Sequence, residues 1–224
     1  STLAVHPLVM PAEHGAWGLL LEPLVLGLVI APSAPGALIA IAALAAFLAR
    51  QPLKLAIQDA MRGRHYPRTR ICRWLAAANL AAAAMALLIV WQVNGWTPLL
   101  ALIPALPLVA IQFERDVRAR GRSLVAEMAG AAAPAAAAAA IILAGGKSVS
   151  MAAIVSCLIL ALSIPAVLFV RGQFSRTRRS VSLLAHVLAA GVAMAVAPPL
   201  AIAAMLLLLA RAQLTPAGLP ARVI

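Results

Sequence analysis

The stretch EHGAWGLLLEPLVLGLVIAP, residues 13–32, decides the class of fold to expect. After Glu13 and His14, the run 15–32 carries only one ionisable side chain, that of Glu22. A helix needs about 20 predominantly apolar residues to cross the hydrocarbon core of a bilayer, which is about 30 Å thick. This run is therefore typical of a membrane-spanning helix, with one carboxylate placed inside it.

The composition of the whole chain supports the same class. Hydrophobic residues make up 64% of the 224 residues and charged residues 11%, and the mean hydropathy is +1.01. Soluble domains carry about 45–50% apolar and about 25% charged residues, and disordered chains have the opposite bias. Cys72 and Cys157 fall in apolar runs and are expected to be small buried hydrophobes. The first run lacks a basic leader, so no cleavable signal peptide is expected.

The remaining apolar runs predict an all-α, polytopic bundle of about eight spans that forms a single transmembrane domain over residues 1–224. The predicted spans lie near 15–32, 36–50, 70–92, 97–113, 123–144, 150–171, 181–197 and 199–212. The last two are short and meet at Pro198 and Pro199, so one broken segment is the alternative.

The basic residues predict the orientation of the bundle. Of the 18 Lys and Arg residues, all but Lys147 fall on one face of the predicted topology. Cytoplasmic loops collect Lys and Arg, so this face and the N-terminus are predicted to be cytoplasmic, and Trp91 and Trp96 mark the opposite interface. The net charge of +12 then reflects topology and attraction to anionic lipid headgroups, and no nucleic-acid partner is expected.

Acids and histidines gather on the same side, which the rule for basic residues does not predict. The carboxylates are Glu13, Glu22, Asp59, Glu114, Asp116 and Glu127, and the histidines are His6, His14, His65 and His186. An acid at the centre of a spanning helix costs about 2.5–3.5 kcal/mol, and Glu22 and Glu127 lie within predicted spans. Either each pairs with one cytoplasmic Arg or Asn and only locks helices together, or they line a polar pocket open to the cytoplasm.

Two local patterns shape this predicted pocket. His14, Gly18 and Glu22 follow i, i+4 and i+8, so they share one helix face, and Pro23 favours a kink directly after Glu22. The segment 52–63 is predicted to be a separate amphipathic helix at the membrane interface, because Pro suits a first helical position and Gly the position after the end.

The cytoplasmic ends of three predicted spans share a further pattern. FLARQ (47–51), AIQFERD (110–116) and LFVRGQ (168–173) each place an aromatic residue beside Arg and Gln. Ordinary snorkelling at a helix end is one explanation. Three helical hairpins presenting polar tips to one shared site are the other.

Three stretches together resemble the YwiC-like family of bacterial membrane proteins. They are PAEHGAWGLLLEP (11–23), RQPLKLAIQDAMRGRHYPRTR (50–70) and FERDVRARGRSLVAEMAG (113–130). The resemblance covers nearly the whole chain and implies a multi-pass protein of the bacterial inner, or cytoplasmic, membrane. It implies no assigned activity.

The chain is also distantly similar to the UbiA-like intramembrane prenyltransferases. Gln58-Asp59, Arg68-Thr69 and the segment 114–118 fall where those enzymes carry their two polar motifs. That similarity implies Mg²⁺ held by Asp59, Glu114 and Asp116 against a prenyl pyrophosphate. The chain departs from the motif at Arg62 and Tyr66, where the enzymes have aspartates, so the aspartate-rich cage of those enzymes is absent.

Three functions follow as hypotheses. The first is binding, and possible UbiA-like transfer, of an anionic phospholipid or isoprenoid that carries phosphate or pyrophosphate. Its candidate catalytic residues are His14, Glu22, Asp59 and Asp116; its candidate substrate-binding residues are Glu13, Arg50, Lys54, Arg68, Arg115, Arg118, Glu127 and Arg171. The second is a proton-coupled transporter with Glu22, His14 and Glu127 as relay. The third is a non-catalytic membrane assembly factor. A haem or metal protein built on histidine or cysteine ligands is disfavoured because HxxxH and CxxC spacings are absent.

Overall fold

The computed structural model describes residues 14–63, 66–119, 121 and 123–172, and isolated positions at 187, 190, 191, 194 and 195. The described residues are helical and include no strand, which confirms the all-α prediction. The predicted spans 181–197 and 199–212 lie almost wholly outside the described residues. Two compact units, residues 1–167 and 168–224, divide the chain. The packing described below belongs to the first unit.

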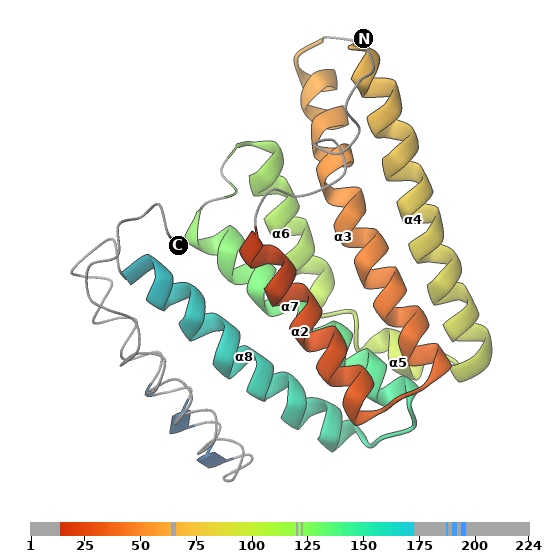
Figure 1. The fold of residues 1–224 in the computed structure, drawn as a ribbon, viewed down its shortest axis with the longest axis vertical. Coiled ribbons are helices and arrows are strands. Elements are labelled where there is room, and N and C mark those ends of the chain that lie inside the picture. Colours follow the sequence, from red (N-terminus) through yellow and green to blue (C-terminus); the bar gives the residue numbers. More distant parts are fainter. Residues whose placement is uncertain are drawn as a thin grey trace. The chain divides into compact units, whose positions relative to one another are not determined.

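The helices follow the first six predicted spans in order (Figure 1). They are α2 (His14–Ile30), α3 (Ala34–Met61), α4 (Pro67–Asn94), α5 (Thr97–Leu100), α6 (Ala105–Val117), α7 (Leu124–Ala144) and α8 (Val149–Gly172). Among the described residues, α3, α4, α7 and α8 are long and apolar enough to cross a membrane, and α2 is a shorter apolar helix. The chain is therefore a multi-pass membrane protein.

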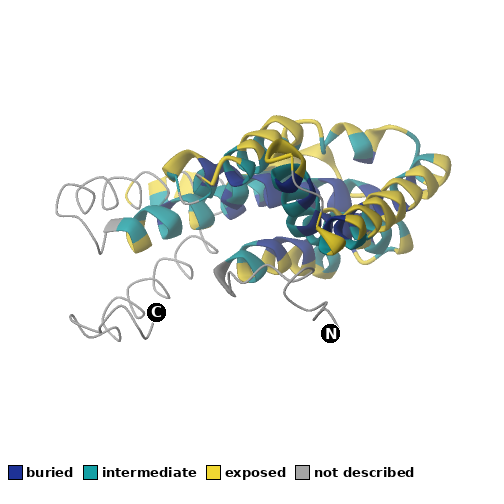
Figure 2. Cartoon of the chain, turned by 90° about the horizontal axis from the view of Figure 1, so that it is seen from above, coloured by how far each residue is buried: buried dark blue, intermediate teal, exposed yellow. Residues whose placement is uncertain are grey.

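Helix α7 lies at the centre of the first unit and contacts α2, α3, α5 and α6. Most of its buried residues are alanines, and small side chains let neighbouring helices approach closely in a membrane. Figure 2 shows this buried interior in dark blue. One core cluster joins four helices through Leu20, Ile39, Val90 and Ile141. A second joins α7 to α8 and the end of α2 through Ala31, Ala138, Ile142 and Val155.

Three glycines allow the turn between α2 and α3 to lie directly on α7. A Cβ atom at Gly27 or Gly36 would lie 3.2 or 3.1 Å from the side chain of Ile141. A Cβ atom at Gly145 would lie 2.7 Å from Cβ and 2.8 Å from the carbonyl oxygen of Ala31. The backbones are therefore close enough at these points that a side chain has little room.

The prediction of a separate interfacial helix at 52–63 was wrong. Pro52 lies inside α3, which continues without interruption to Met61. A proline inside a helix removes one backbone hydrogen bond, but here its ring is fully buried, and that packing offsets the loss. At 1.5 Å per residue the 28 residues of α3 extend about 42 Å, so the helix continues beyond a hydrocarbon core of about 30 Å.

The predicted span 97–113 is divided between α5 and α6. The intervening residues form tight turns closed by i to i+3 hydrogen bonds, such as Ile103 N to Leu100 O at 3.1 Å and Ala105 N to Leu102 O at 3.0 Å. Pro104 and Pro107 have no N–H to donate, which favours this tighter 3₁₀ pattern over a continuous α-helix.

One non-glycine residue has a left-handed backbone and makes a direct prediction possible. Ala119, just after α6, has φ +57°, a conformation that costs a non-glycine residue about 1 kcal/mol or more. We expect Ala119→Gly to raise the free energy of unfolding by up to about 1 kcal/mol, as measured by denaturant titration in detergent. Ala110→Gly, within α6, is the control and should lower that free energy by about 1 kcal/mol. Equal destabilisation by both variants would contradict the prediction.

Candidate functional site

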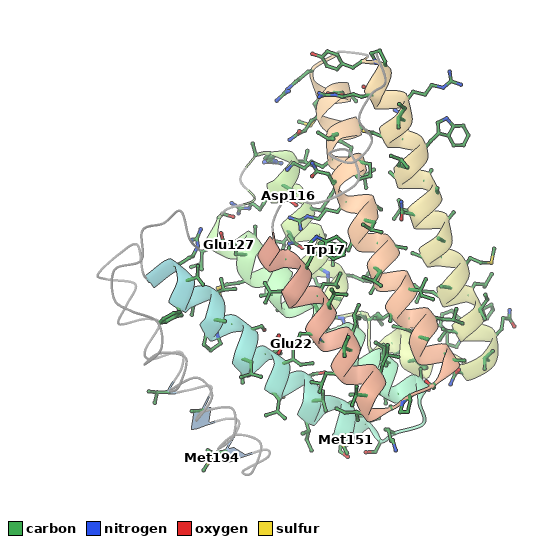
Figure 3. All side chains as sticks on the ribbon, viewed as in Figure 1. Trp17, Glu22, Asp116, Glu127, Met151 and Met194 are labelled. Atoms are coloured by element: carbon green, nitrogen blue, oxygen red, sulfur yellow. The ribbon has the colours of Figure 1, made fainter. Side chains whose placement is uncertain are left out.

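The candidate site lies at the end of the first unit where α3 and α6 end and α4 and α7 begin, which we call the charged end. Figure 3 labels Asp116 and Glu127 at this end, and Glu22 further along α2. Here Trp17 of α2 meets Phe47 of α3 edge-on, with ring centroids 5.0 Å apart. This contact places the start of α2 beside α3, shortly before α3 reaches the charged end.

Asp59 is buried, and both of its carboxylate oxygens accept hydrogen bonds. Arg68 Nη2 donates to Oδ1 at 3.0 Å, and Arg68 Nε donates to Oδ2 at 3.4 Å. The Thr69 hydroxyl also donates to Oδ2, at 2.7 Å. The carboxylate therefore binds the last turn of α3 to the first turn of α4.

The local backbone explains why these three residues meet. Gly63, with φ +62°, follows the end of α3 and adopts a left-handed conformation readily. Tyr66 is the N-cap of α4, and its N–H donates to the Thr69 hydroxyl at 3.2 Å. Thr69 thus caps α4 and holds Asp59 at the same time. The guanidinium of Arg68 also lies 4.9 Å from the centre of the Tyr66 ring, within cation–π range.

Asp116 is the second buried carboxylate, and it binds α6 to α3. Its Oδ2 atom accepts a charge-assisted hydrogen bond from Arg50 Nε. Gln58 Nε2 donates to the carbonyl oxygen of Val117 at 2.8 Å, which gives the same two helices a second link. A Cβ atom at Gly121 would overlap Asp116 Oδ1, so the loop after α6 passes directly over this carboxylate.

Glu114, the third predicted metal ligand, is on the surface. It pairs with Arg118 at 2.8 Å and with Arg115 at 3.4 Å, and exposed pairs of this kind contribute at most about 1 kcal/mol. All three predicted ligands are thus engaged by arginines. The described residues include no group of three or more His, Cys, Asp or Glu side chains placed to hold a metal ion. A Mg²⁺ ion bound by these acids would have to displace the arginines, and the magnesium site stays a prediction.

The remaining predicted site residues are not brought into this set of contacts. Glu22 and Gly18 are exposed on α2, and a Cβ atom at Gly18 would have no neighbour within 4 Å. Glu127 is partly buried in the first turn of α7, where a carboxylate interacts favourably with the helix dipole. Arg171 belongs to the second unit. Glu13 and the side chain of His14 lie outside the described residues.

A comparison with protein families identifies the chain. The model for the YwiC-like protein family matches residues 10–142, more than half of the sequence. The chain belongs to the YwiC-like family. Neither the comparison with curated proteins nor that with solved structures gave a match.

The residues matched to the YwiC-like family include every contact of Asp59 and Asp116 described above. Lys54, which lies between Arg50 and Asp59 in the sequence of α3, is partly buried and forms no ion pair with a described residue. The similarity to UbiA-like enzymes stays a prediction.

Sequence reasoning did not assign roles to three residues of this site. Thr69 was visible only as part of an Arg-Thr motif, and its contact with the N–H of the N-cap Tyr66 follows only from the structure. Gln58 offered no signal for its contact with a backbone carbonyl. Gly121 lay in a basic loop, and its need to be glycine follows only from the position of Asp116.

Proposed function

We propose that the charged end of this YwiC-like protein binds an anionic lipid, either a phospholipid or an isoprenoid that carries phosphate or pyrophosphate. The proposal includes the predicted topology of about eight spans, with the charged end cytoplasmic in a bacterial inner membrane. The observation that carries it is the fixing of Arg50 and Arg68 by buried carboxylates beside an apolar bundle. Arginine forks match phosphate oxygens.

The two arginines retain donors for such a ligand. A guanidinium has five N–H donors; Arg50 uses Nε and Arg68 uses Nε and Nη2 in their carboxylate contacts. Their side chains are 19% and 39% exposed, so the remaining donors are accessible. Asp59 and Asp116 then act as positioning residues, which hold the guanidinium groups in place before the ligand arrives.

The first test compares a lipid with its isolated headgroup. We expect farnesyl pyrophosphate to bind the detergent-solubilised protein at least about 10-fold more tightly than inorganic pyrophosphate, because only the lipid also buries apolar surface. Isothermal titration calorimetry measures both affinities. Arg50→Lys, which keeps the charge but loses the fork, should weaken lipid binding about 10-fold. Lys147→Ala, in the turn between α7 and α8, is the control and should have no effect.

The same titration decides the role of the acids. Under the proposal, Mg²⁺ leaves the affinity unchanged within about twofold, and Asp59→Asn weakens binding by loosening Arg68. Mg²⁺-dependent binding that Asp59→Asn abolishes would favour the UbiA-like alternative, in which Asp59 and Asp116 hold the metal and His14 or Glu22 serves as base. Equal binding of lipid and inorganic pyrophosphate would contradict the proposal.

Glu22 supports a second candidate function, a proton-coupled carrier. It lies inside an apolar helix and forms no ion pair or hydrogen bond with a described residue, and an ionisable residue at membrane depth is a candidate member of a proton relay. Proton flux into proteoliposomes that is lost in Glu22→Gln but kept in Glu114→Gln would establish this function in place of the first.

A further inference from the structure

The two sides of α4 differ in burial along the whole helix. Residues of one side are buried against neighbouring helices, chiefly α3: Thr69, Cys72, Ala76, Ala83, Ala86 and Val90. The opposite side is exposed. Its residues follow one another at helical spacing: Arg70, Trp74, Ala77, Ala81, Met85 and Leu88. Figure 2 shows exposed residues in yellow along this helix, which is the rightmost one in Figure 1. This second side has no helix of the described chain upon it.

The first two turns of this exposed side are cationic. Arg70 and Arg73 are both exposed, and neither forms an ion pair with a residue that the structure describes. Helix α4 itself contains no Asp or Glu. Arg50 and Arg68, in contrast, are held by buried carboxylates on the other side of the hairpin. The charges of Arg70 and Arg73 are therefore not neutralised by the part of the chain that the structure describes.

Trp74 gives the depth of these arginines in the bilayer. Its side chain is 69% exposed, and tryptophans concentrate where hydrocarbon meets headgroups. Trp91, at the other end of α4, contacts Trp96 with ring centroids 5.2 Å apart. From Trp74 to Trp91 the helix rises about 26 Å, close to the thickness of a hydrocarbon core. Arg70 and Arg73 consequently lie level with one layer of headgroups.

We propose that Arg70, Arg73 and Trp74 bind the headgroup of an anionic phospholipid from the surrounding bilayer, whose acyl chains lie along the exposed apolar side of α4. The guanidinium groups contact the phosphate, and the indole N–H donates to a headgroup oxygen. Met85 and Leu88 continue the same side at the depth of the acyl chains. The site faces away from Asp59 and Arg68, so it is separate from the ligand site proposed above.

An anionic lipid matches this surface better than a zwitterionic one. Each basic residue near an anionic headgroup layer contributes about 1 kcal/mol of attraction, so two arginines favour a headgroup with net negative charge by roughly 10-fold or more. A protein partner on this side would have to cover Arg70 and Arg73 with its own acids at headgroup depth. It would also exclude lipid from Trp74, which a measurement can detect.

The test uses Trp74 as the reporter in nanodiscs. Trp17, Trp91 and Trp96 are replaced by Phe, and bromine-labelled phosphatidylglycerol or phosphatidylcholine is added at the same molar fraction. We expect the labelled phosphatidylglycerol to quench Trp74 at least about twofold more strongly than the labelled phosphatidylcholine. The double variant Arg70→Ala/Arg73→Ala should lose this preference. The control Arg62→Ala/Lys147→Ala removes the same charge elsewhere and should keep it.

A second measurement avoids the tryptophan replacements. Native mass spectrometry of the otherwise unmodified chain should show one more retained phosphatidylglycerol than in the Arg70→Ala/Arg73→Ala variant, in agreement with the quenching. Equal quenching by both lipids, loss of the preference in the control variant, or shielding of Trp74 from both lipids would each overturn the proposal; shielding would assign this side to a protein partner.

Discussion

Replacing Asp59 by alanine is expected to lower the free energy of unfolding by about 3 kcal/mol, the largest effect we predict for one side chain. Removing one partner of a buried ion pair costs about 3–5 kcal/mol. The value falls at the lower end because Arg68 is 39% exposed and can turn toward water. The Thr69 hydroxyl, which is buried, loses its acceptor as well.

The measurement is unfolding in detergent followed by circular dichroism, with Glu114→Ala as the matched control. Glu114 also binds two arginines, but it is 45% exposed, so its loss should cost less than about 1 kcal/mol. Arg68→Ala and the double variant Asp59→Ala/Arg68→Ala complete a thermodynamic cycle and should give a coupling energy of at least about 1 kcal/mol. If Asp59→Ala and Glu114→Ala lower the free energy of unfolding by the same small amount, Asp59 does not bind α3 to α4 in the way described.

The second large effect is expected at Gly145. A methyl group there would collide with both Cβ and the backbone carbonyl of Ala31. Backbone atoms cannot rotate aside as a long side chain can, so α2 and α7 must separate, and overpacking of this kind costs about 1–3 kcal/mol. The φ of Gly145 is −83°, which alanine adopts without strain. Any loss of stability in Gly145→Ala is therefore steric.

Gly18→Ala provides the control for that substitution. The Cβ atom would meet no atom within 4 Å, and alanine has the higher helix propensity by about 1 kcal/mol. Gly18→Ala should therefore leave the midpoint of thermal unfolding unchanged or raise it, whereas Gly145→Ala should lower it. Indistinguishable midpoints would show that the close approach of α2 to α7 does not exist in the folded protein.

The sequence predicts the helices well because an apolar run must satisfy its own backbone in a membrane. The predicted span 123–144 corresponds to α7 (Leu124–Ala144), and 150–171 corresponds to α8. Breaks inside spans were harder to predict. Pro52 was expected to begin a helix and lies within one, because its buried packing is invisible in the sequence. Pro104, in contrast, accompanies a real interruption. The predictions of about eight spans and of a single domain over 1–224 concern residues beyond those described.

The site was predictable in its composition and not in its pairings. Sequence reasoning gathered Asp59, Asp116, Arg50 and Arg68 at one end of the bundle, and the structure joins them in two ion pairs. It could not predict that Arg50 binds a carboxylate 66 residues away, since tertiary packing decides that contact. Both acids inside the predicted spans, Glu22 and Glu127, lie outside these pairs.

The unbroken course of α3 has a consequence for its response to salt. Arg62, at the end of the helix, lies 12 residues beyond Arg50, a distance of about 18 Å along the axis. The Debye length at physiological ionic strength is about 8 Å. Because Arg68 pairs with Asp59, the headgroup layer at Arg70 and Arg73 lies beside the last turns of α3, so Arg62 extends toward water and Arg50 lies on the inner side of that layer. Dissolved ions therefore screen the charge of Arg62 more strongly than that of Arg50. One continuous helix thus exposes two of its cations to different degrees of ionic screening.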